Sequence, residues 1–183
     1  MKKGSLVYLT AIEKDDLKQL KYWRNIEDLK KYFREYRDIN DNMQDKWFQN
    51  IASNDSSTSM FSIKRISDNE LLGACGLCYI NWINRYADLS LYIGYNEIYI
   101  DEEGYAKESC ELLLDYGFNQ LGLNKIWTEI YEFDYKKKFL YESIGFEVDG
   151  KLRQNYFYDG RWWNSFIVSI LKDDFSKGNK RRQ

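Results

Sequence analysis

Histidine is missing from the whole 183-residue chain. Hydrolases that pair a serine or cysteine nucleophile with a histidine base need this residue, and so do zinc sites that use an imidazole ligand. The absence excludes most common hydrolases and all histidine-bearing zinc sites. Any proton transfer in this protein must use other side chains.

Cysteine is also scarce. The chain has three, Cys75, Cys78 and Cys110, an odd number that fits a reducing compartment better than a disulfide framework. Cys75 and Cys78 stand in the apolar stretch 71–80, which is typical of a strand, where residues three apart face opposite sides. A structural zinc site needs four ligands. We therefore expect three thiols, packed mainly in the core, and no metal.

A long apolar run and a strong charge of one sign are absent as well. No stretch approaches the roughly 20 apolar residues that span a bilayer, and charged residues follow the start too closely for a signal peptide. The 27 basic and 29 acidic residues are interspersed and leave a formal net charge of −2, which creates no broad field for nucleic acid or anionic lipid. We expect a cytoplasmic protein without a nucleic-acid or membrane partner.

Apolar and aromatic residues, by contrast, are plentiful. They make up 44% and 17% of the chain, enough for a substantial core, and the length fits one domain. We expect a single domain over 1–172. The basic residues near the end predict a flexible tail over 173–183.

Along the chain, the spacing of hydrophobic residues changes between that of helices and that of strands. The expected helices are 13–25, 26–36, 43–53, 104–120 and 134–145. The expected strands are 6–12, 60–66, 71–80, 86–95, 125–133 and a pair within 146–171 around the turn at Asp159 and Gly160. Because strand, helix, strand and helix follow one another after residue 85, the sequence predicts an α/β fold with a mixed sheet and helices on both faces.

One strand carries polar residues at alternate positions. In the stretch 86–95, the apolar residues Ala87, Leu89, Leu91 and Ile93 alternate with Asp88, Ser90 and Tyr92. Alternate residues of a strand point to opposite faces. We expect one face of this strand to join the core and the other to be free for polar chemistry.

Three segments resemble a known family. Residues 104–109 read GYAKES, residues 140–153 read LYESIGFEVDGKLR, and residues 23–25 read WRN, with Tyr32 and Phe33 following. Together they resemble the GNAT superfamily of acetyl-CoA-dependent N-acetyltransferases, and most of all its branch of ribosomal-protein N-terminal and amino-sugar acetyltransferases. The resemblance implies the GNAT fold with a mixed, mostly antiparallel seven-stranded sheet, and acetyl-CoA as co-substrate.

The stretch before residue 104 bears on the cofactor. A helix N-terminus offers about four unpaired amides and roughly half a positive charge, which suits a pyrophosphate at the bare backbone of Gly104 and Ala106. Asp101, Glu102 and Glu103 precede this turn, and we expect their carboxylates to point outward. The family usually has arginine or glutamine where Asp101 stands.

The resemblance also implies a set of cofactor contacts. They are Leu91, Tyr92, Ile93, Glu103, Gly104, Tyr105, Ala106, Lys107, Asp134, Lys137, Lys138 and Tyr141. Several have a structural alternative: the acidic turn as a stabiliser of the helix dipole, Asp134 as a helix N-cap, and the lysine run 136–138 as a solvated helix face.

Acetyl transfer to an amine needs a base, a donor to the oxyanion and a proton for the thiolate. By resemblance, Tyr141 matches the tyrosine at the CoA sulfur, and the amide near Ile93 matches the donor to the thioester carbonyl. Asp88 and Glu129, on neighbouring strands, are the expected bases. The alternatives are a Tyr141 packed in the core and two solvated strand carboxylates.

The acceptor should lie against the first helices. We expect contacts from Arg24, Asn25, Tyr32, Trp47 and Trp82, although most of these aromatics could equally belong to the core. An amine of pKa near 8 is about one tenth neutral at pH 7, whereas one near 10.4 is neutral in roughly one molecule per two thousand.

This arithmetic favours an acceptor of low pKa, so the sequence predicts a small-molecule amine such as an amino sugar or a nucleotide-linked amino sugar. A protein N-terminal acetyltransferase and a non-catalytic CoA-binding domain are the alternatives. We expect a monomer or homodimer.

Overall fold

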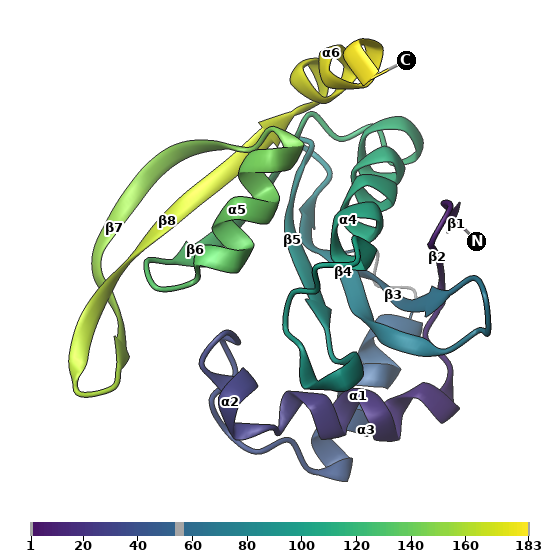
Figure 1. The fold of residues 1–183 in the computed structure, drawn as a ribbon, viewed down its shortest axis with the longest axis vertical. Coiled ribbons are helices and arrows are strands. Elements are labelled where there is room, and N and C mark those ends of the chain that lie inside the picture. Colours follow the sequence, from purple (N-terminus) through teal and green to yellow (C-terminus); the bar gives the residue numbers. More distant parts are fainter. Residues whose placement is uncertain (1, 54–56, 183) are drawn as a thin grey trace.

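The structure, a computed structural model, describes residues 2–53 and 57–182. Its centre is one sheet of eight strands in the order β1-β2-β3-β4-β5-β6-β8-β7 (Figure 1). The strands are β1 (Lys2–Lys3), β2 (Val7–Ala11), β3 (Ser59–Arg65), β4 (Leu71–Asn81), β5 (Tyr86–Ile93), β6 (Lys125–Tyr131), β7 (Glu147–Tyr158) and β8 (Arg161–Leu171). The predicted mixed fold is confirmed, with one strand more than expected because the short β1 pairs with β2.

Helices account for most of the remaining chain. They are α1 (Lys14–Arg24), α2 (Glu27–Lys30), α3 (Asp41–Ala52), α4 (Tyr105–Asp115), α5 (Tyr135–Ile144) and α6 (Lys172–Arg182), with the short turns η1 (Tyr95–Glu97) and η2 (Tyr116–Gln120). The helix expected over 26–36 is only one turn long. Beyond it, Tyr32 stacks on Tyr99 at 4.2 Å and Phe33 packs edge-on against Tyr92, so tertiary contacts replace helix there.

The end of the chain also differs from its expected form. Residues 172–182 form helix α6, where the sequence predicted a flexible tail over 173–183. Phe175 of this helix is buried and lies 5.4 Å from the ring of Phe118. No helix among the described residues is long and apolar enough to cross a membrane.

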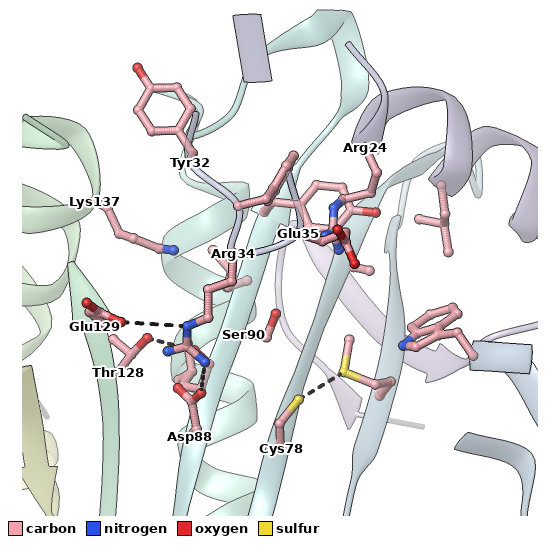
Figure 2. Close-up of a pocket in the computed structure, with 18 of the residues that line it drawn as sticks. Arg24, Tyr32, Arg34, Glu35, Cys78, Asp88, Ser90, Thr128, Glu129 and Lys137 are labelled. Atoms are coloured by element: carbon pink, nitrogen blue, oxygen red, sulfur yellow. Dashed lines mark hydrogen bonds and ion pairs between the residues drawn. The ribbon is translucent and has the colours of Figure 1, made fainter. Parts of the chain in front are cut away.

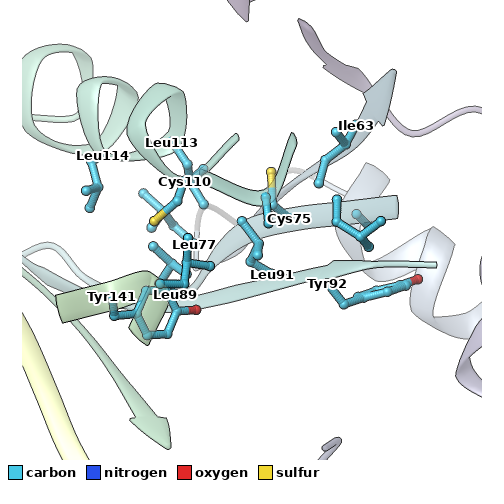
Figure 3. Packing of buried hydrophobic residues seen from close by; sticks show 14 of the residues in the cluster. Ile63, Cys75, Leu77, Leu89, Leu91, Tyr92, Cys110, Leu113, Leu114 and Tyr141 are labelled. Atoms are coloured by element: carbon cyan, nitrogen blue, oxygen red, sulfur yellow. The ribbon is translucent and has the colours of Figure 1, made fainter. Parts of the chain in front are cut away.

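Helices cover both faces of the sheet. Residues of β4 and β5 with odd numbers, such as Cys75, Leu77 and Leu89, are buried beside α4 (Figure 3). Residues with even numbers, such as Ala74 and Asp88, belong to the opposite face and line a cavity together with residues of α1 and α3. The alternation expected along 86–95 is therefore present.

The three cysteines follow the same division. Cys75 and Cys110 are buried, and Cys78 is partly buried and borders the cavity on the opposite face from Cys75. All three are free thiols. Burial raises the pKa of the Cys78 thiol to about 11, so it is protonated at neutral pH. The interpretation of these residues as packing thiols is confirmed.

Strands β5 and β6 are parallel, whereas every other neighbouring pair in the sheet is antiparallel. Their pairing covers only Tyr86 to Asp88 of β5 and Lys125 to Trp127 of β6. Beyond these residues the two strands diverge. The two strands therefore leave an opening between them in the middle of the sheet, and the cavity lies beside this opening.

Glu108 of α4 ties the start of the chain to the helix layer. Its carboxylate accepts hydrogen bonds from the backbone amides of Ser5, Leu6 and Val7 at 2.7, 2.8 and 2.8 Å, and from the Ser5 hydroxyl at 2.5 Å. These contacts hold the two residues before β2 and its first residue, Val7, and β2 pairs with β3 inside the sheet. Burial raises the pKa of Glu108, but the four hydrogen bonds outweigh it and the pKa is lowered overall.

We expect Glu108→Ala to lower the free energy of unfolding by about 1–3 kcal/mol at pH 7, because three backbone amides lose a charged acceptor and that of Val7 is partly buried. Urea denaturation measures this loss. Since the pKa of Glu108 is lowered in the folded state, its contribution is complete at neutral pH and disappears as the pH falls through the folded pKa. The control is Glu142→Ala, whose ion pair with Lys138 is exposed. Equal losses for the two variants would contradict the assignment.

Candidate active site

A cavity of about 380 Å³ lies between the first helices and the opening between β5 and β6 (Figure 2). Residues of β5 and β6 form its floor, and residues from α1, α3 and the segment between α2 and α3 form the opposite wall. The polar and charged residues that line it are Arg24, Tyr32, Arg34, Glu35, Gln44, Tyr79, Asp88, Ser90, Tyr92, Thr128, Glu129, Tyr131, Asp134 and Lys137.

The backbone of β5 is exposed to this opening at one residue in particular. Nearer the paired end, the Leu89 carbonyl accepts a hydrogen bond from Thr128 Oγ1 at 2.9 Å. At the other end, the Ile93 amide donates to the Tyr99 carbonyl at 3.0 Å. Because the backbone groups of alternate residues point to the same edge of a strand, those of Leu91 face the opening between the two strands.

The expected donor amide near Ile93 is therefore not that of Ile93 itself. Its amide is bonded to Tyr99, because η1 and the loop after it fold back against the end of β5. The amide that faces the opening between β5 and β6 is that of Leu91, two residues earlier.

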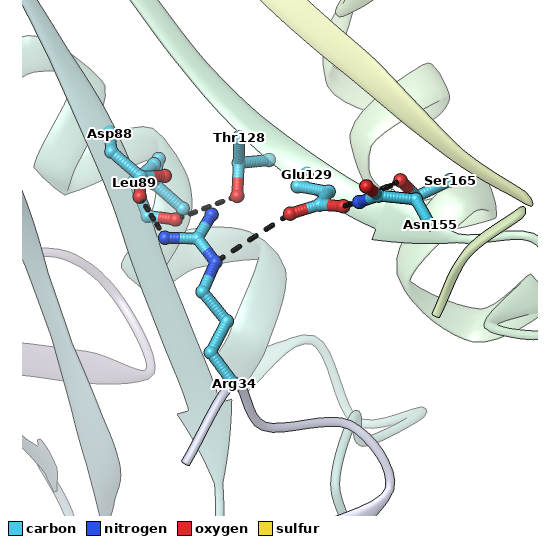
Figure 4. Close-up of polar contacts among 7 residues, drawn as sticks. All are labelled: Arg34, Asp88, Leu89, Thr128, Glu129, Asn155 and Ser165. Carbon is cyan, nitrogen blue, oxygen red and sulfur yellow. Dashed lines mark hydrogen bonds and ion pairs between the residues drawn. The ribbon is translucent and has the colours of Figure 1, made fainter. Parts of the chain in front are cut away.

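The two predicted bases are brought together by one arginine. The guanidinium of Arg34 pairs with Asp88 Oδ2 through Nη1 and lies 3.8 Å from Glu129 Oε2 through Nε (Figure 4). The remaining oxygen of Glu129 accepts hydrogen bonds from Asn155 Nδ2 at 2.7 Å and Ser165 Oγ at 2.5 Å. Strands β7 and β8 therefore fix the direction in which Glu129 points.

Asp88 has an unusual environment for a carboxylate. Its side chain is only 4% exposed, and its Oδ1 atom is buried with no hydrogen-bond partner among the described residues. Burial raises the pKa of Asp88, and the ion pair with Arg34 opposes that rise. A carboxyl group with a raised pKa is a better proton acceptor at neutral pH than an ordinary one.

Lys137 reaches the cavity from α5. Its ammonium group lies 5.2 Å from the ring centre of Tyr99. Burial lowers the pKa of Lys137, whereas the nearby Asp134 carboxylate raises it. Asp134 itself caps α5 by accepting from the Lys137 amide at 3.0 Å, so the N-cap alternative for this residue is present in the structure.

Tyr141, the predicted proton donor, is fully buried against Phe146 and beside Cys110 and Leu89 (Figure 3). It does not line the cavity. Its hydroxyl has no hydrogen-bond partner among the described residues, which is costly for a buried polar group unless a ligand supplies one. Burial raises the pKa of Tyr141 well above its usual value, so the phenol stays protonated and keeps a proton to donate.

The acidic turn before α4 differs from expectation. The carboxylate of Asp101 does not point outward but accepts from the amides of Gly104 and Tyr105 at 2.7 Å each and of Ala106 at 2.6 Å. Unpaired amides and the positive end of the helix dipole attract the nearest carboxylate. The amides predicted to bind pyrophosphate are therefore already bonded within the chain.

The predicted acceptor residues divide into two groups. Arg24, Tyr32 and Trp47 line the cavity. Asn25 does not, because its amide group accepts from the Ile39 amide at 2.8 Å and donates to the Ile39 carbonyl at 2.9 Å. Trp82, which follows β4, also lies outside the cavity lining and is partly exposed.

The predicted cofactor residues divide in the same way. Leu91, Tyr92, Asp134 and Lys137 line the cavity. Lys138 lies on the exposed face of α5, 3.8 Å from Glu142. The residues outside the cavity lining are Ile93, Glu103, Gly104, Tyr105, Ala106, Lys107, Lys138 and Tyr141.

Arg34 is the functional candidate that sequence reasoning missed. The segment around it was predicted to be a helix over 26–36, and no local pattern marks one arginine of that segment as special. Its partners are 54 and 95 residues away in the sequence. Only the folded chain brings them together.

The chain is similar to known proteins over most of its length. A family model described as an acetyltransferase (GNAT) domain matches residues 7–147. Spermidine N(1)-acetyltransferase from Vibrio cholerae is 27% identical over 173 residues, which cover 94% of this chain and 96% of that protein.

Solved structures are similar over the same length. The crystal structure of spermidine N-acetyltransferase from Vibrio cholerae in complex with CoA and spermine gives a TM-score of 0.84 at 25% identity, covering 93% of this chain and 98% of that chain. A dodecameric structure of the same enzyme in an intermediate state gives 0.78 at 26% identity, covering 97% and 98%.

The cap formed by Asp101 leads to a prediction. Asp101→Ala should lower the free energy of unfolding by about 1–2 kcal/mol, or the melting temperature by about 2–8 °C for a domain of this size, because three amides of α4 lose their acceptor. The same change frees those amides, so inorganic pyrophosphate should raise the melting temperature of the variant more than that of the unmodified protein. Thermal melts followed by circular dichroism measure both effects.

Glu102→Ala is the control, since it removes a neighbouring carboxylate for which the structure shows no contact with the α4 amides. If both variants respond alike to pyrophosphate, the effect is one of net charge and not of the cap.

Proposed function

The chain belongs to the GNAT acetyltransferase family and is an N-acetyltransferase, and from this premise we propose that it acetylates a primary amine of a small, flexible polyamine. The observation that carries the proposal is the pair of carboxylates in the cavity. Asp88 and Glu129 face one cationic group, that of Arg34, beside the opening in the sheet. A site that already accommodates a cation between two carboxylates suits an acceptor that is an ammonium ion at neutral pH.

The relatives favour this acceptor over an amino sugar. The curated protein and the solved structures described above act on spermidine, according to their names, and one structure contains spermine. They do not support the narrower branch of ribosomal-protein and amino-sugar enzymes that the sequence suggested. The sequence predicted a monomer or homodimer. One similar structure is a dodecamer, so the comparisons do not support that prediction.

The pKa argument from sequence considered only the neutral fraction of the acceptor. An amine of pKa near 10.4 enters as an ammonium ion, and carboxylates bind that form well. The ammonium ion must also lose a proton before it can react. Asp88 accepts that proton more readily than an ordinary carboxylate does, because burial raises its pKa. A high-pKa amine is therefore compatible with this site although a solvated carboxylate would be a poor base for it.

The cavity and the opening fit the thioester arm of acetyl-CoA. Acetyl-CoA supplies the acetyl thioester when bound. The Leu91 amide faces the opening and is placed to donate to a carbonyl there, and the buried Tyr141 hydroxyl lacks a partner among the described residues. We assign Tyr141 to the thiol end of the cofactor and Asp88 to the amine, with Glu129 as the second carboxylate.

The pyrophosphate end fits less directly. The amides of Gly104, Tyr105 and Ala106 are bonded to Asp101, so a pyrophosphate that used them would displace that carboxylate. Gly104 has φ of 99° and its position would leave a Cβ only one contact, with Leu6 Cδ1 at 3.5 Å. The backbone at this turn is therefore accessible once the carboxylate has moved.

Release of free CoA thiol from acetyl-CoA tests the proposed activity. We expect spermidine and spermine to give a higher kcat/KM than glucosamine, a peptide with a free N-terminus or a peptide with an internal lysine, because a second ammonium group adds a contact with the acidic cavity. Faster turnover of an amino sugar or a peptide would overturn the polyamine assignment. No thiol release with any amine would overturn the assigned activity itself.

Tyr141→Phe tests the assigned proton donor. The variant keeps the ring and its packing and removes only the hydroxyl, so we expect kcat to fall tenfold or more, about 1.4 kcal/mol in activation free energy. The melting temperature should stay within a few degrees of the original, because the hydroxyl has no hydrogen-bond partner among the described residues. An unchanged kcat would indicate that Tyr141 has only a structural role.

A further inference from the structure

Arg34 lies in an irregular segment whose backbone is held by its neighbours, and its own side chain is half-exposed. The neighbouring rings hold the segment, since Tyr32 stacks on Tyr99 and Phe33 lies buried against Tyr92 and Tyr99. The side chain of Arg34 is 49% exposed, whereas that of its partner Asp88 is 4% exposed. The guanidinium can therefore turn into solvent without disturbing the core, while the carboxylate that it leaves stays buried.

The other two basic residues of the cavity are held differently. The guanidinium of Arg24 lies 4.2 Å from the ring centre of Phe33, and the ammonium of Lys137 lies 5.2 Å from that of Tyr99. Among the described residues, Arg34 is the only basic residue in an ion pair with Asp88 or Glu129. It is thus the one cation whose departure would uncover both carboxylates.

The charge balance of the cavity depends on this side chain. The charged residues in the lining are Arg24, Arg34, Lys137, Glu35, Asp88, Glu129 and Asp134. With Arg34 in place, three cations oppose four carboxylates. If its guanidinium leaves, two cations remain beside four carboxylates, and Asp88 and Glu129 lose the positive charge that lies between them.

We propose that Arg34 is an internal substitute for the acceptor's ammonium group: it pairs with Asp88 and Glu129 when no amine is bound, and a cationic acceptor takes its place. Arg34 is then a specificity-determining residue that competes with the substrate. This inference rests on the proposed function, because it assigns the carboxylate pair to the acceptor.

Two physical consequences follow. A buried carboxylate without a counter-ion is costly, so Arg34 keeps the empty site stable and an amine must supply an equivalent cation to displace it. The apparent affinity for the amine is also reduced by the small fraction of molecules in which Arg34 has left the pair. Removing Arg34 should therefore strengthen amine binding, the opposite of what loss of a binding residue does.

The exchange also affects the base. Burial raises the pKa of Asp88 and Arg34 opposes that rise. When Arg34 leaves, the pKa of Asp88 increases until the ammonium group replaces the lost charge. Without Arg34, the free enzyme should therefore hold Asp88 protonated up to a higher pH, and the acidic limb of kcat/KM should move upward.

Steady-state kinetics with Arg34→Met test the proposal. We expect KM for spermidine to fall about fivefold or more and the acidic limb of kcat/KM to move to higher pH. Arg34→Lys keeps the charge and should return both quantities toward those of the unmodified enzyme. Lys31→Met is the matched control: it removes one positive charge from the same segment, and Lys31 lies over the Tyr32 ring and outside the cavity lining, so both quantities should stay unchanged.

A direct observation of the side chain does not depend on the folding of the Met variant. The Nε–H signal of Arg34 in a ¹⁵N spectrum, assigned by its loss in Arg34→Lys, should move on addition of saturating spermidine to the position of solvent-exposed arginines. A signal that stays in place while spermidine is turned over would overturn the proposal. So would an Arg34→Met enzyme with a lower kcat and an unchanged or higher KM, since Arg34 would then contribute to the reaction itself.

The proposed function can fail separately. If no amine is acetylated by the unmodified enzyme, the acetyltransferase assignment fails, and thermal melts still test Arg34. In that case Arg34→Met should melt below the unmodified protein and be stabilised by spermidine more than the unmodified protein is. Equal stabilisation of the two proteins would count against the substitution of one cation for another.

Discussion

The divergence of β5 and β6 after Asp88 is the constraint on which the site depends. Parallel pairing ends at this residue, and the Thr128 hydroxyl and the Tyr99 carbonyl bond the backbone on either side of Leu91. The floor of the cavity, the accessible amide and the meeting point of the two carboxylates all follow from this opening. A sheet that stayed paired through Ile93 would have no space for a thioester.

The chain places its own charged groups at both subsites. Arg34, a cation, lies between the carboxylates assigned to the amine, and Asp101, an anion, bonds the amides predicted for pyrophosphate. Arg34 carries the same positive charge as the expected amine, and Asp101 carries the same negative charge as the expected pyrophosphate. The same physical reason explains both, because a buried carboxylate and the unpaired amides of a helix N-terminus are each unstable without a partner.

Aromatic packing decides where the irregular segment after α2 lies. Tyr32 and Phe33 dock on Tyr99 and Tyr92, and this docking ends the helical pattern and directs Arg34 at the floor of the cavity. The residues that the sequence suggested for the acceptor thus act in two ways. Some line the cavity, and others, such as Asn25, hold the segment that forms its wall.

Much of the fold was determined by the sequence alone. The alternation along 86–95 distinguished Asp88 and Ser90, which line the cavity, from the core residues Ala87 and Ile93. The turn at Asp159 and Gly160 separated β7 from β8, and Asp88 and Glu129 were predicted to lie on neighbouring strands. These features depend on local periodicity and on turn residues, which a single sequence displays.

Tertiary structure alone decided the rest. The one-turn length of α2 and the position of Arg34 between Asp88 and Glu129 depend on contacts with residues far along the chain. The physical reason is that periodicity fixes which face a residue occupies. Its charge partner is fixed only when the chain packs.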